Sequence, residues 1–332
     1  MKNKKIIILL ITILLLTGCT KQLKDVNGKI VKNEETGQTL PSNIMCQPED
    51  KEIIKIYDDT KAAKEKKLAK DLKNEKITKT EYNKQMKSLL DIHKLPKCSN
   101  FKITSGGYEG LWNTIFIKPL TWFLIKLGQL LNNYGLAIIF ATLLIRLLLY
   151  PITRKTLKQS EMMRKVQPEM KKIEQKYADK KDQQSMTMKS QEIMALYKKY
   201  NVNPMSGCLF SFLQIPLFFA FYEALYRLPV LFEDNFLVFN MATTPMAALS
   251  KGHYYYLILP ILVLVVTFFS FKANKNNGAG GSEKQMKTMM NVMLVIIVFT
   301  SFQMSTAIIL YWITNSGFTI LQNLLVKRSK KW

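Results

Sequence analysis

Long apolar runs alternate with lysine-rich polar segments along the chain. Five apolar runs follow residue 132, and each has about the length that crosses the roughly 30 Å hydrocarbon core of a bilayer as a helix, although the fourth is short. They are residues 133–153, 206–225, 253–271, 288–302 and 306–326. This pattern predicts an all-α membrane protein with a five-transmembrane-helix bundle over 132–332.

The loops between these runs differ in charge, and the difference predicts their side of the membrane. Residues 154–205 carry thirteen Lys or Arg against six acidic residues, whereas 226–252 holds two basic and two acidic residues. Because strongly basic loops stay on the cytoplasmic side, we expect 154–205 and the C-terminus inside and the N-terminus outside.

The basic loop itself predicts a cytoplasmic helical hairpin over 154–200. Two segments rich in Met, Lys, Glu and Gln, Glu161–Tyr177 and Gln183–Tyr200, are separated by a short polar stretch. Pro168 is expected to mark a boundary or kink near the start of the first helix. Few large apolar side chains are present, which predicts a hairpin without a strong core.

Residues 111–131 are apolar, yet we expect them to lie on the outer membrane surface as an interfacial amphipathic helix. On an ideal helix their polar side chains share one face. These side chains are Thr114, Lys118, Thr121, Lys126 and Gln129. A sixth span here would also send the thirteen-charge loop outside, against the positive-inside rule.

Residues 1–18 predict a lipoprotein signal peptide. Three lysines precede an apolar run of eleven residues, which is too short to span a membrane. The following Leu16-Thr17-Gly18-Cys19 resembles the bacterial lipobox, in which the Cys is lipidated (palmitate is the expected acyl group) and becomes the first mature residue. An ordinary signal peptide or short anchor with a chance Cys is the alternative. Lipidation of Cys19 would anchor the N-terminus on the outer face of the cell membrane.

Residues 19–110 are predicted to form an exported, lysine-rich helical segment. Charges alternate at helical spacing over 51–92, and Thr78 with Glu81 matches a capping box that restarts a helix. We expect a helical hairpin bounded by Cys46 and Cys98, where the exported side permits a disulfide. The basic charge could bind lipid headgroups or nucleic acid, although a solvated helix face is the simpler interpretation.

The composition argues against an enzyme. The chain has two histidines and four cysteines without a CxxC pair, which gives metal or redox chemistry little support. The GAGG stretch at 278–281 is typical of a flexible linker and not of a phosphate loop. No cofactor is therefore predicted.

Arg146 stands inside an apolar run, where an arginine costs about 2.5–3.5 kcal/mol. The only acidic residue in the five runs is Glu223, near the opposite end of its run, so the two are not expected to meet. Snorkelling to the headgroups is one explanation of the charge. The other is a wet cavity lined by polar side chains. Candidates are Thr142, Ser211, Gln214, Thr267, Ser301, Gln303, Tyr311, Trp312 and Asn315.

Several motifs together resemble the YidC/Oxa/Alb membrane-insertase family. In order over about 112–328 they are YGLAII…LLIRLLLYPIT, QPEMKKI, LYKKYNVNP, NPMSGC leading into FLQIPLFFAFYEAL, and LYWITN. With the lipobox, they resemble the Gram-positive lipoprotein branch. The resemblance implies a helical bundle around a hydrophilic groove that is open to the cytoplasm and to lipid. A Pro-Ala-Gly turn common in the family is replaced here by Gln303–Ala307, which leaves the geometry of that turn open.

The resemblance also implies roles for particular residues. The groove arginine of the family corresponds to Arg146, the Gln of its LQxP motif to Gln214, and its LYW aromatic pair to Tyr311 and Trp312. Thr142 and Ser211 are added as polar groove candidates. Basic tails in the family approach ribosomes, and phosphate attracts such charge. The tail of this chain contains Lys327, Arg328, Lys330 and Lys331.

The predicted function is a membrane protein insertase that takes nascent clients from the cytoplasm and releases them sideways into membrane lipid. It would act alone or with a Sec-type translocon, with a monomeric core. A small-solute or ion transporter using Arg146 and a lipid-anchored sensor or scaffold are the alternatives. The runs show no inverted repeat and no acidic ion ligand, which speaks against the transporter.

Overall fold

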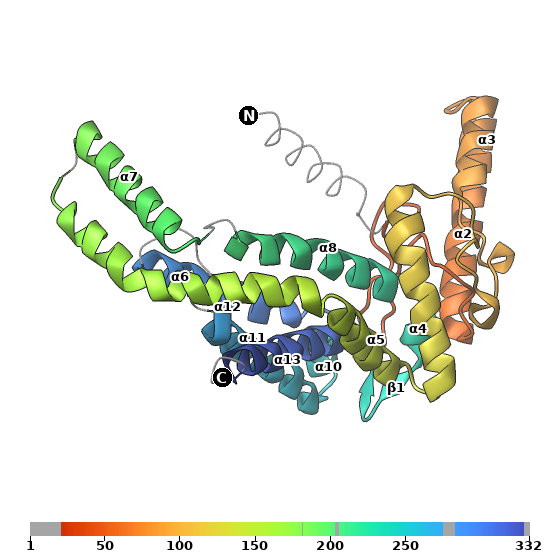
Figure 1. The fold of residues 1–332 in the computed structure, drawn as a ribbon. Coiled ribbons are helices and arrows are strands. Elements are labelled where there is room, and N and C mark those ends of the chain that lie inside the picture. The colour runs from red at the N-terminus through yellow and green to blue at the C-terminus, as the bar shows by residue number, and fades with distance from the viewer. Residues whose placement is uncertain (1–20, 181, 203–205, 275–282, 329–332) are drawn as a thin grey trace. The chain divides into compact units, whose positions relative to one another are not determined.

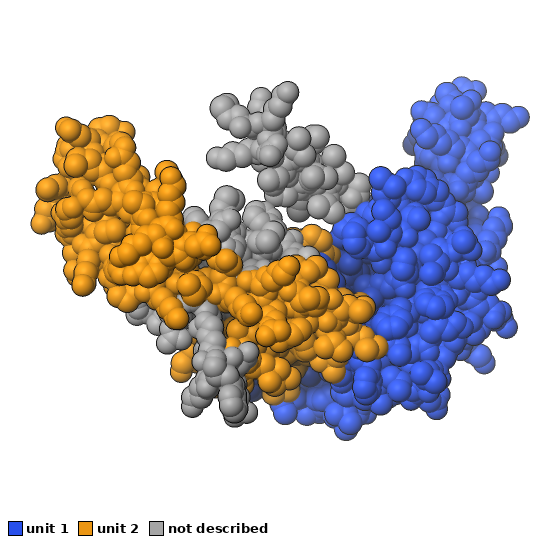
Figure 2. Space-filling view, viewed as in Figure 1, with its two compact units in different colours: residues 1–142, 217–261, 299–312 blue, residues 143–216, 262–298, 313–332 orange. Residues whose placement is uncertain are grey.

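The computed structural model describes residues 21–180, 182–202, 206–274 and 283–328, and within these ranges it is mostly helical (Figure 1). The predicted signal peptide, Cys19, Lys330 and Lys331 lie outside the described residues. The chain divides into two compact units (Figure 2). Unit 1 comprises residues 1–142, 217–261 and 299–312, and unit 2 comprises 143–216, 262–298 and 313–332.

The five predicted spans all appear as helices. They are α5 (Tyr134–Leu148), α8 (Ser206–Tyr226), α11 (Ile258–Asn274), α12 (Glu283–Ser301) and α13 (Thr306–Arg328). By length and composition, two described helical segments could cross a membrane, Asn113–Leu131 and Tyr254–Ala273. A third candidate arises if α5 and the start of α6 count as one bent span. The count of five spans therefore remains a prediction.

The first part of unit 1 is not helical, which corrects the expectation for this stretch of the exported segment. Residues 21–47 form a meander of isolated β-bridges, which pair Gln22 with Pro41, Lys24 with Ile30 and Lys32 with Thr39. Gly28 and Gly37 have φ angles of +81° and +69°, a backbone region that glycine enters at little cost. Turns at these two positions reverse the chain before a helix can propagate.

The helical hairpin predicted over 51–92 is formed by α2 (Lys51–Lys73) and α3 (Lys79–Ser88). Thr78 and Glu81 make the reciprocal contacts of a capping box at the start of α3. Short 3₁₀ turns follow at Ile92–Lys94 (η1) and Cys98–Asn100 (η2). The hairpin and the meander share one apolar core with the later loop. Its buried members are Leu23, Leu40, Ile44, Ile53, Tyr57, Ile92, Phe232 and Ala242.

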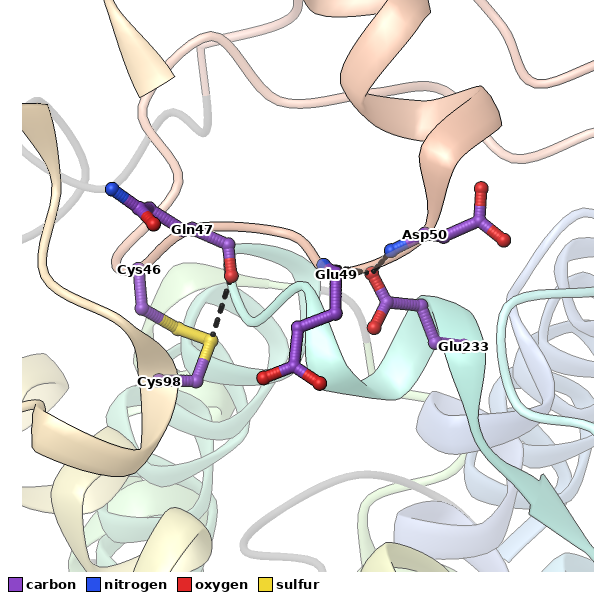
Figure 3. Close-up of a disulfide and its surroundings, with 6 residues drawn as sticks. All are labelled: Cys46, Gln47, Glu49, Asp50, Cys98 and Glu233. Atoms are coloured by element: carbon purple, nitrogen blue, oxygen red, sulfur yellow. Dashed lines mark hydrogen bonds between the residues drawn. A yellow bond between two sulfur atoms is a disulfide. The ribbon is translucent and has the colours of Figure 1, made fainter. Parts of the chain in front are cut away.

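A disulfide joins Cys46 to Cys98 across 52 positions of sequence (Figure 3). The carbonyl oxygen of Gln47 lies 3.3 Å from Sγ of Cys98, which is a contact and not a hydrogen bond because a disulfide sulfur carries no proton. Beside it, a carboxylate oxygen of Glu233 accepts hydrogen bonds of 2.7 Å from the backbone N–H groups of both Glu49 and Asp50. Burial raises the pKa of Glu233, and these two hydrogen bonds oppose the rise. The hairpin base is thus fastened to the loop after α8.

The segment predicted to be interfacial begins with a π-helical turn, η3 (Asn113–Ile117), and continues as α4 (Lys118–Leu131). The polar side chains that were expected to share one face differ in burial. Lys118 is buried and donates to the carbonyl oxygens of Ser105 (2.6 Å) and Gly107, whereas Lys126 is exposed. The exposed positions are largely apolar. They include Leu111, Ile115, Phe116, Trp122 and Leu130. Such a surface suits contact with lipid.

The loop after α8 packs as a compact cap within unit 1. It contains α9 (Val230–Glu233), a hairpin of β1 (Asn235–Phe236) and β2 (Phe239–Asn240), α10 (Pro245–Ser250) and η4 (Tyr254–Leu257). Asn235 pairs with Asn240 in the antiparallel register. The turn between α12 and α13 docks on this cap, since Met246 N–H donates to the Phe302 carbonyl and Thr306 N–H to the Thr243 carbonyl. This contact defines the turn geometry that the sequence left open.

In unit 2, α6 (Tyr150–Lys176) and α7 (Gln183–Lys199) pack together as the predicted hairpin. The first helix starts eleven residues earlier than expected, and Pro168 lies inside it. Pro168 therefore does not bound the helix. The hairpin has a small apolar core, in keeping with the expectation that it lacks a strong one. Its buried members are Met163, Val166, Met170, Leu196, Tyr197 and Val202.

Candidate functional site

Arg146 is buried, with 3% of its surface exposed, and lies in the last turn of α5. Its Nε donates to Oδ1 of Asn315 on α13 at 2.6 Å, and a terminal nitrogen donates to Oε1 of Gln214 on α8 at 2.5 Å. All three residues belong to unit 2. Gln214 and Asn315 are neutral amides, so these two contacts solvate the guanidinium without cancelling its charge.

The local fold explains why the arginine lies at a helix end. The predicted span 133–153 is broken at Leu149, and the two helical parts meet at 58°. Pro151 lies in the first turn of α6, and its ring cannot follow a continuous helix because it would clash with the carbonyl of Leu147. The break puts Arg146 at the negative end of the α5 dipole, which stabilises a cation by about 0.3–1 kcal/mol.

A polar stripe on α13 continues from Asn315 through unit 2. Its buried members are Ser316, Thr319, Gln322 and Asn323. Gln322 Nε2 donates to Oγ1 of Thr153 on α6 at 2.5 Å, and Gln322 Oε1 is buried with no hydrogen-bond partner among the described residues. The sequence analysis missed these four residues and Thr153. On α13, Thr319, Gln322 and Asn323 follow Asn315 at four, seven and eight positions, and this helical spacing was the available signal.

The other predicted groove residues are placed differently. Tyr311 and Trp312 belong to unit 1, where they pack on α8 aromatics. Tyr311 stacks on Phe221 with ring centroids 4.4 Å apart, and Trp312 meets Phe218 edge-on at 5.3 Å. Thr142 is also in unit 1 and donates to the Ile138 carbonyl of its own helix. The side chains of Ser211, Lys327 and Arg328 lie outside the described residues.

A second buried arginine, Arg227, lies in unit 1 with 0% of its surface exposed. It donates to the carboxylates of Glu109 at 2.7 Å and Glu223 at 3.3 Å, to Oδ1 of Asn113 at 2.6 Å and to the Asn43 carbonyl at 2.6 Å. Trp112 donates to the other Glu223 oxygen at 3.2 Å. The one acidic residue of the predicted spans is therefore engaged by Arg227.

Metal ligation finds no support in the described part of the chain, where no group of three or more His, Cys, Asp or Glu side chains could hold an ion. The polar cluster around Arg146 is instead built from amides and hydroxyls. Such a cluster offers a cation and hydrogen-bond donors and acceptors within apolar helices. It can bind a polar or acidic group.

The sequence profile of a family described as 60Kd inner membrane protein matches residues 126–331, a range that includes Arg146, Gln214 and Asn315. The chain belongs to the YidC/Oxa family. The relative named membrane protein insertase YidC from Oceanobacillus iheyensis is 36% identical over 226 residues, or 66% of this chain and 85% of the relative. Membrane protein insertase MisCA from Bacillus subtilis is 36% identical over 236 residues, or 70% and 86% of the two chains.

A crystal structure of an active YidC insertase with its first transmembrane domain resolved aligns with a TM-score of 0.47 at 22% identity. The alignment covers 79% of this chain and 52% of that chain. Family membership together with the apolar helices makes this chain a multi-pass membrane protein. The profile match begins at residue 126, so the segment 21–110 lies outside the residues that the profile matches.

Proposed function

We propose that the chain is a membrane protein insertase in which Arg146 receives the polar or acidic tail of a client. Two observations support this function. The chain shares the YidC/Oxa region with relatives named insertases. A buried arginine in that region donates hydrogen bonds to the amides of Gln214 and Asn315, and these amides solvate its charge without neutralising it.

The proposed mechanism follows from charge and hydration. Attraction between Arg146 and a client carboxylate is stronger in a low-dielectric setting than in water. Gln214 and Asn315 orient the guanidinium, and the polar stripe of α13 supplies further hydrogen-bonding groups along the helix. The client's apolar segment then gains free energy by moving into lipid. Tyr311, Trp312, Thr142 and Ser211 are proposed as further groove residues.

The membrane arrangement is part of the same proposal. Five spans would place the N-terminus outside, anchored by a lipid on Cys19, and the C-terminus in the cytoplasm. Segment 19–110 and the surface helix 111–131 would then lie on the outer side, and the hairpin 154–200 would meet clients inside. A monomeric core would act alone or with a Sec-type translocon. The basic tail of Lys327, Arg328, Lys330 and Lys331 would contact the ribosome.

Reconstitution tests this function. Purified protein in liposomes is given a single-span client with an acidic N-terminal tail, and a neutral-tailed client serves as the substrate control. Arg146→Ala is expected to reduce insertion of the acidic client about tenfold, equivalent to about 1.4 kcal/mol in the barrier, with a smaller effect on the neutral client. Arg146→Lys should retain part of the activity, because it keeps the charge but loses the planar donor geometry.

Lys126→Ala is the matched control, because Lys126 is exposed in α4, outside the hairpin 154–200, and its loss changes the net charge equally. Insertion by this variant should stay near the wild-type level. Wild-type protein that inserts no more client than empty liposomes would refute the insertase function. Robust insertion of the acidic client by Arg146→Ala would keep the insertase and remove the electrostatic role of Arg146.

A further inference from the structure

Unit 1 contains a cavity of about 1030 Å³ that the YidC/Oxa comparison does not explain. Its walls come from the β-bridge meander, the α2–α3 hairpin and residues 101–113, nearly all of them before residue 126, where the profile match begins. Apolar side chains form much of the surface, among them Ile44, Leu89 and Phe101. The volume is at the top of the roughly 300–1,000 Å³ typical of small-molecule sites, which leaves room for several residues of a peptide.

The acidic side chains that line the cavity are already engaged. The carboxylate of Asp91 forms ion pairs with Lys61, with an N–O distance of 3.0 Å, and with Lys94, with an N–O distance of 3.6 Å. Glu65 pairs with Lys61 at 3.6 Å. The remaining two, Glu109 and Glu223, both bind Arg227. These carboxylates therefore add little negative potential to the open space.

Four further lysines, Lys21 among them, line the cavity without such pairing. Within the described ranges, no carboxylate forms an ion pair with Lys21, Lys24, Lys64 or Lys87. Burial lowers the pKa of Lys64, and nearby Asp25 opposes this only in part, so its ammonium is partly stripped of water. A desolvated ammonium gains more from an incoming anion than a fully hydrated one does. The cavity consequently favours a ligand that combines negative charge with apolar groups.

We propose that this cavity binds a short acidic peptide segment, namely the tail of a client after it has crossed the membrane. The inference rests on the proposed function, in which Arg146 selects acidic tails and segment 19–110 lies on the side where those tails emerge. Binding there would hold the translocated tail and slow its return. Charge complementarity with Lys24, Lys64 and Lys87 supports an acidic ligand, and the apolar walls together with the volume support a peptide.

The test uses the full-length protein in nanodiscs of zwitterionic lipid and a fluorescent acidic peptide of eight residues with alternating apolar positions. Fluorescence anisotropy gives Kd for the wild type, for the double variant Lys64→Gln/Lys87→Gln and for the control Lys66→Gln/Lys84→Gln. The control removes the same charge from the same two helices, but neither of its lysines lines the cavity. We expect the first variant to weaken binding about tenfold and the control less than about twofold.

Several outcomes would overturn the peptide site. Equal weakening by both double variants would mean that the peptide responds to net charge and not to the cavity. Unchanged binding in Lys64→Gln/Lys87→Gln would place the peptide elsewhere. Native mass spectrometry in anionic lipid provides another check. Loss of bound anionic lipid by that variant, with unchanged peptide affinity, would make the cavity a lipid-headgroup site.

The peptide measurement is independent of insertion, so the two proposals fail separately. If the wild type inserts no client but binds the peptide through Lys64 and Lys87, the proposed function is wrong and the peptide site stands. If insertion depends on Arg146 but neither lysine affects peptide binding, the peptide site is wrong and the proposed function stands. A basic peptide with the same apolar positions should not bind, and equal affinity for it would also contradict the inference.

Discussion

Two buried arginines in this chain are held by different chemistry. Arg227 in unit 1 meets two carboxylates, those of Glu109 and Glu223. Arg146 in unit 2 is bound by two amides, those of Gln214 and Asn315. Carboxylates cancel an arginine's charge, whereas amides only solvate it. Burial of an arginine is therefore weak evidence of a functional site, and the charge of the groups around it is more informative.

The surroundings of Arg227 and Arg146 also point to different roles. The Arg227 network joins residues far apart in the sequence, from the meander carbonyl of Asn43 to the side chain of Asn113. This network stabilises unit 1 by connecting these segments. The hydrogen bonds that Arg146 donates to Gln214 and Asn315 reach neutral groups on neighbouring helices, and the function proposed for it is to receive charge from outside the chain.

The largest expected effect comes from removing Arg227. Arg227→Met leaves the carboxylate of Glu223 buried without its cation, and breaking a buried ion pair in this way costs about 3–5 kcal/mol. Thermal unfolding of the purified protein in detergent, followed by circular dichroism, measures the loss. The expected result is a strongly lowered melting temperature for the variant.

Arg146→Met is the comparison variant for that experiment. It removes the same charge and a similar side chain, but the amides it leaves can bond to water or to each other, so the melting temperature should fall less. If Arg146→Met lowered the melting temperature as much as Arg227→Met, the distinction between a structural and a functional arginine would be wrong. Client insertion should show the reverse order, with Arg146→Met the more damaging where Arg227→Met still folds.

The sequence predicted the surroundings of Arg146 better than those of Arg227. Polar residues are rare in the apolar runs, so Gln214 and Asn315 stood out as candidate partners. The Arg227 network was missed because Glu109 comes 118 residues earlier, and only the tertiary fold brings the two together.

Helix boundaries were likewise predicted only where a local sequence signal marked them. The capping box at Thr78 is a local signal, and it predicted the start of α3. The break at Leu149 was missed because the apolar run continues through it, although Pro151 was the available signal. The meander over 21–47 is stabilised by packing against the hairpin and the later loop, which no local pattern shows.

An intermediate effect is expected from the disulfide. Replacing Cys46 and Cys98 together by Ser removes a crosslink that closes a 52-residue separation, which typically costs about 2–4 kcal/mol. Because the meander supplies the Asn43 carbonyl to Arg227, the double variant should loosen unit 1 and expose the α2–α3 hairpin. Limited proteolysis measures the cleavage rate within 51–92.

Unit 2 provides the internal control for the disulfide variant. Cleavage within the α6–α7 hairpin should keep its wild-type rate, and so should insertion of the neutral-tailed client. Equal acceleration of cleavage in both hairpins would show that the disulfide stabilises the whole chain. The disulfide variant would then no longer distinguish the stability of unit 1, which contains Arg227, from that of unit 2, which contains Arg146.

The smallest expected effect is at the cap of α3. Thr78→Ala removes the side chain that accepts the Glu81 N–H, and loss of such a cap costs about 0.5–2 kcal/mol of helix stability. Hydrogen exchange at neutral pH should show lower protection factors for the α3 amides only. Neither arginine network contacts Thr78, so the melting transition of unit 1 and client insertion should be unchanged.

The pH dependence of amide protection in α3 gives a second, independent test of the same cap. Hydrogen bonds from the backbone and side chain of Thr78 lower the pKa of Glu81. The folded pKa lies below the unfolded one, so this stabilisation is present above the ordinary glutamate pKa and is lost as pH falls through the folded value. Wild-type α3 protection should therefore fall on acidification, whereas Thr78→Ala should respond less. An equal fall of protection in the two proteins would mean that the pKa of Glu81 does not depend on Thr78. This helix end would then be stabilised by packing.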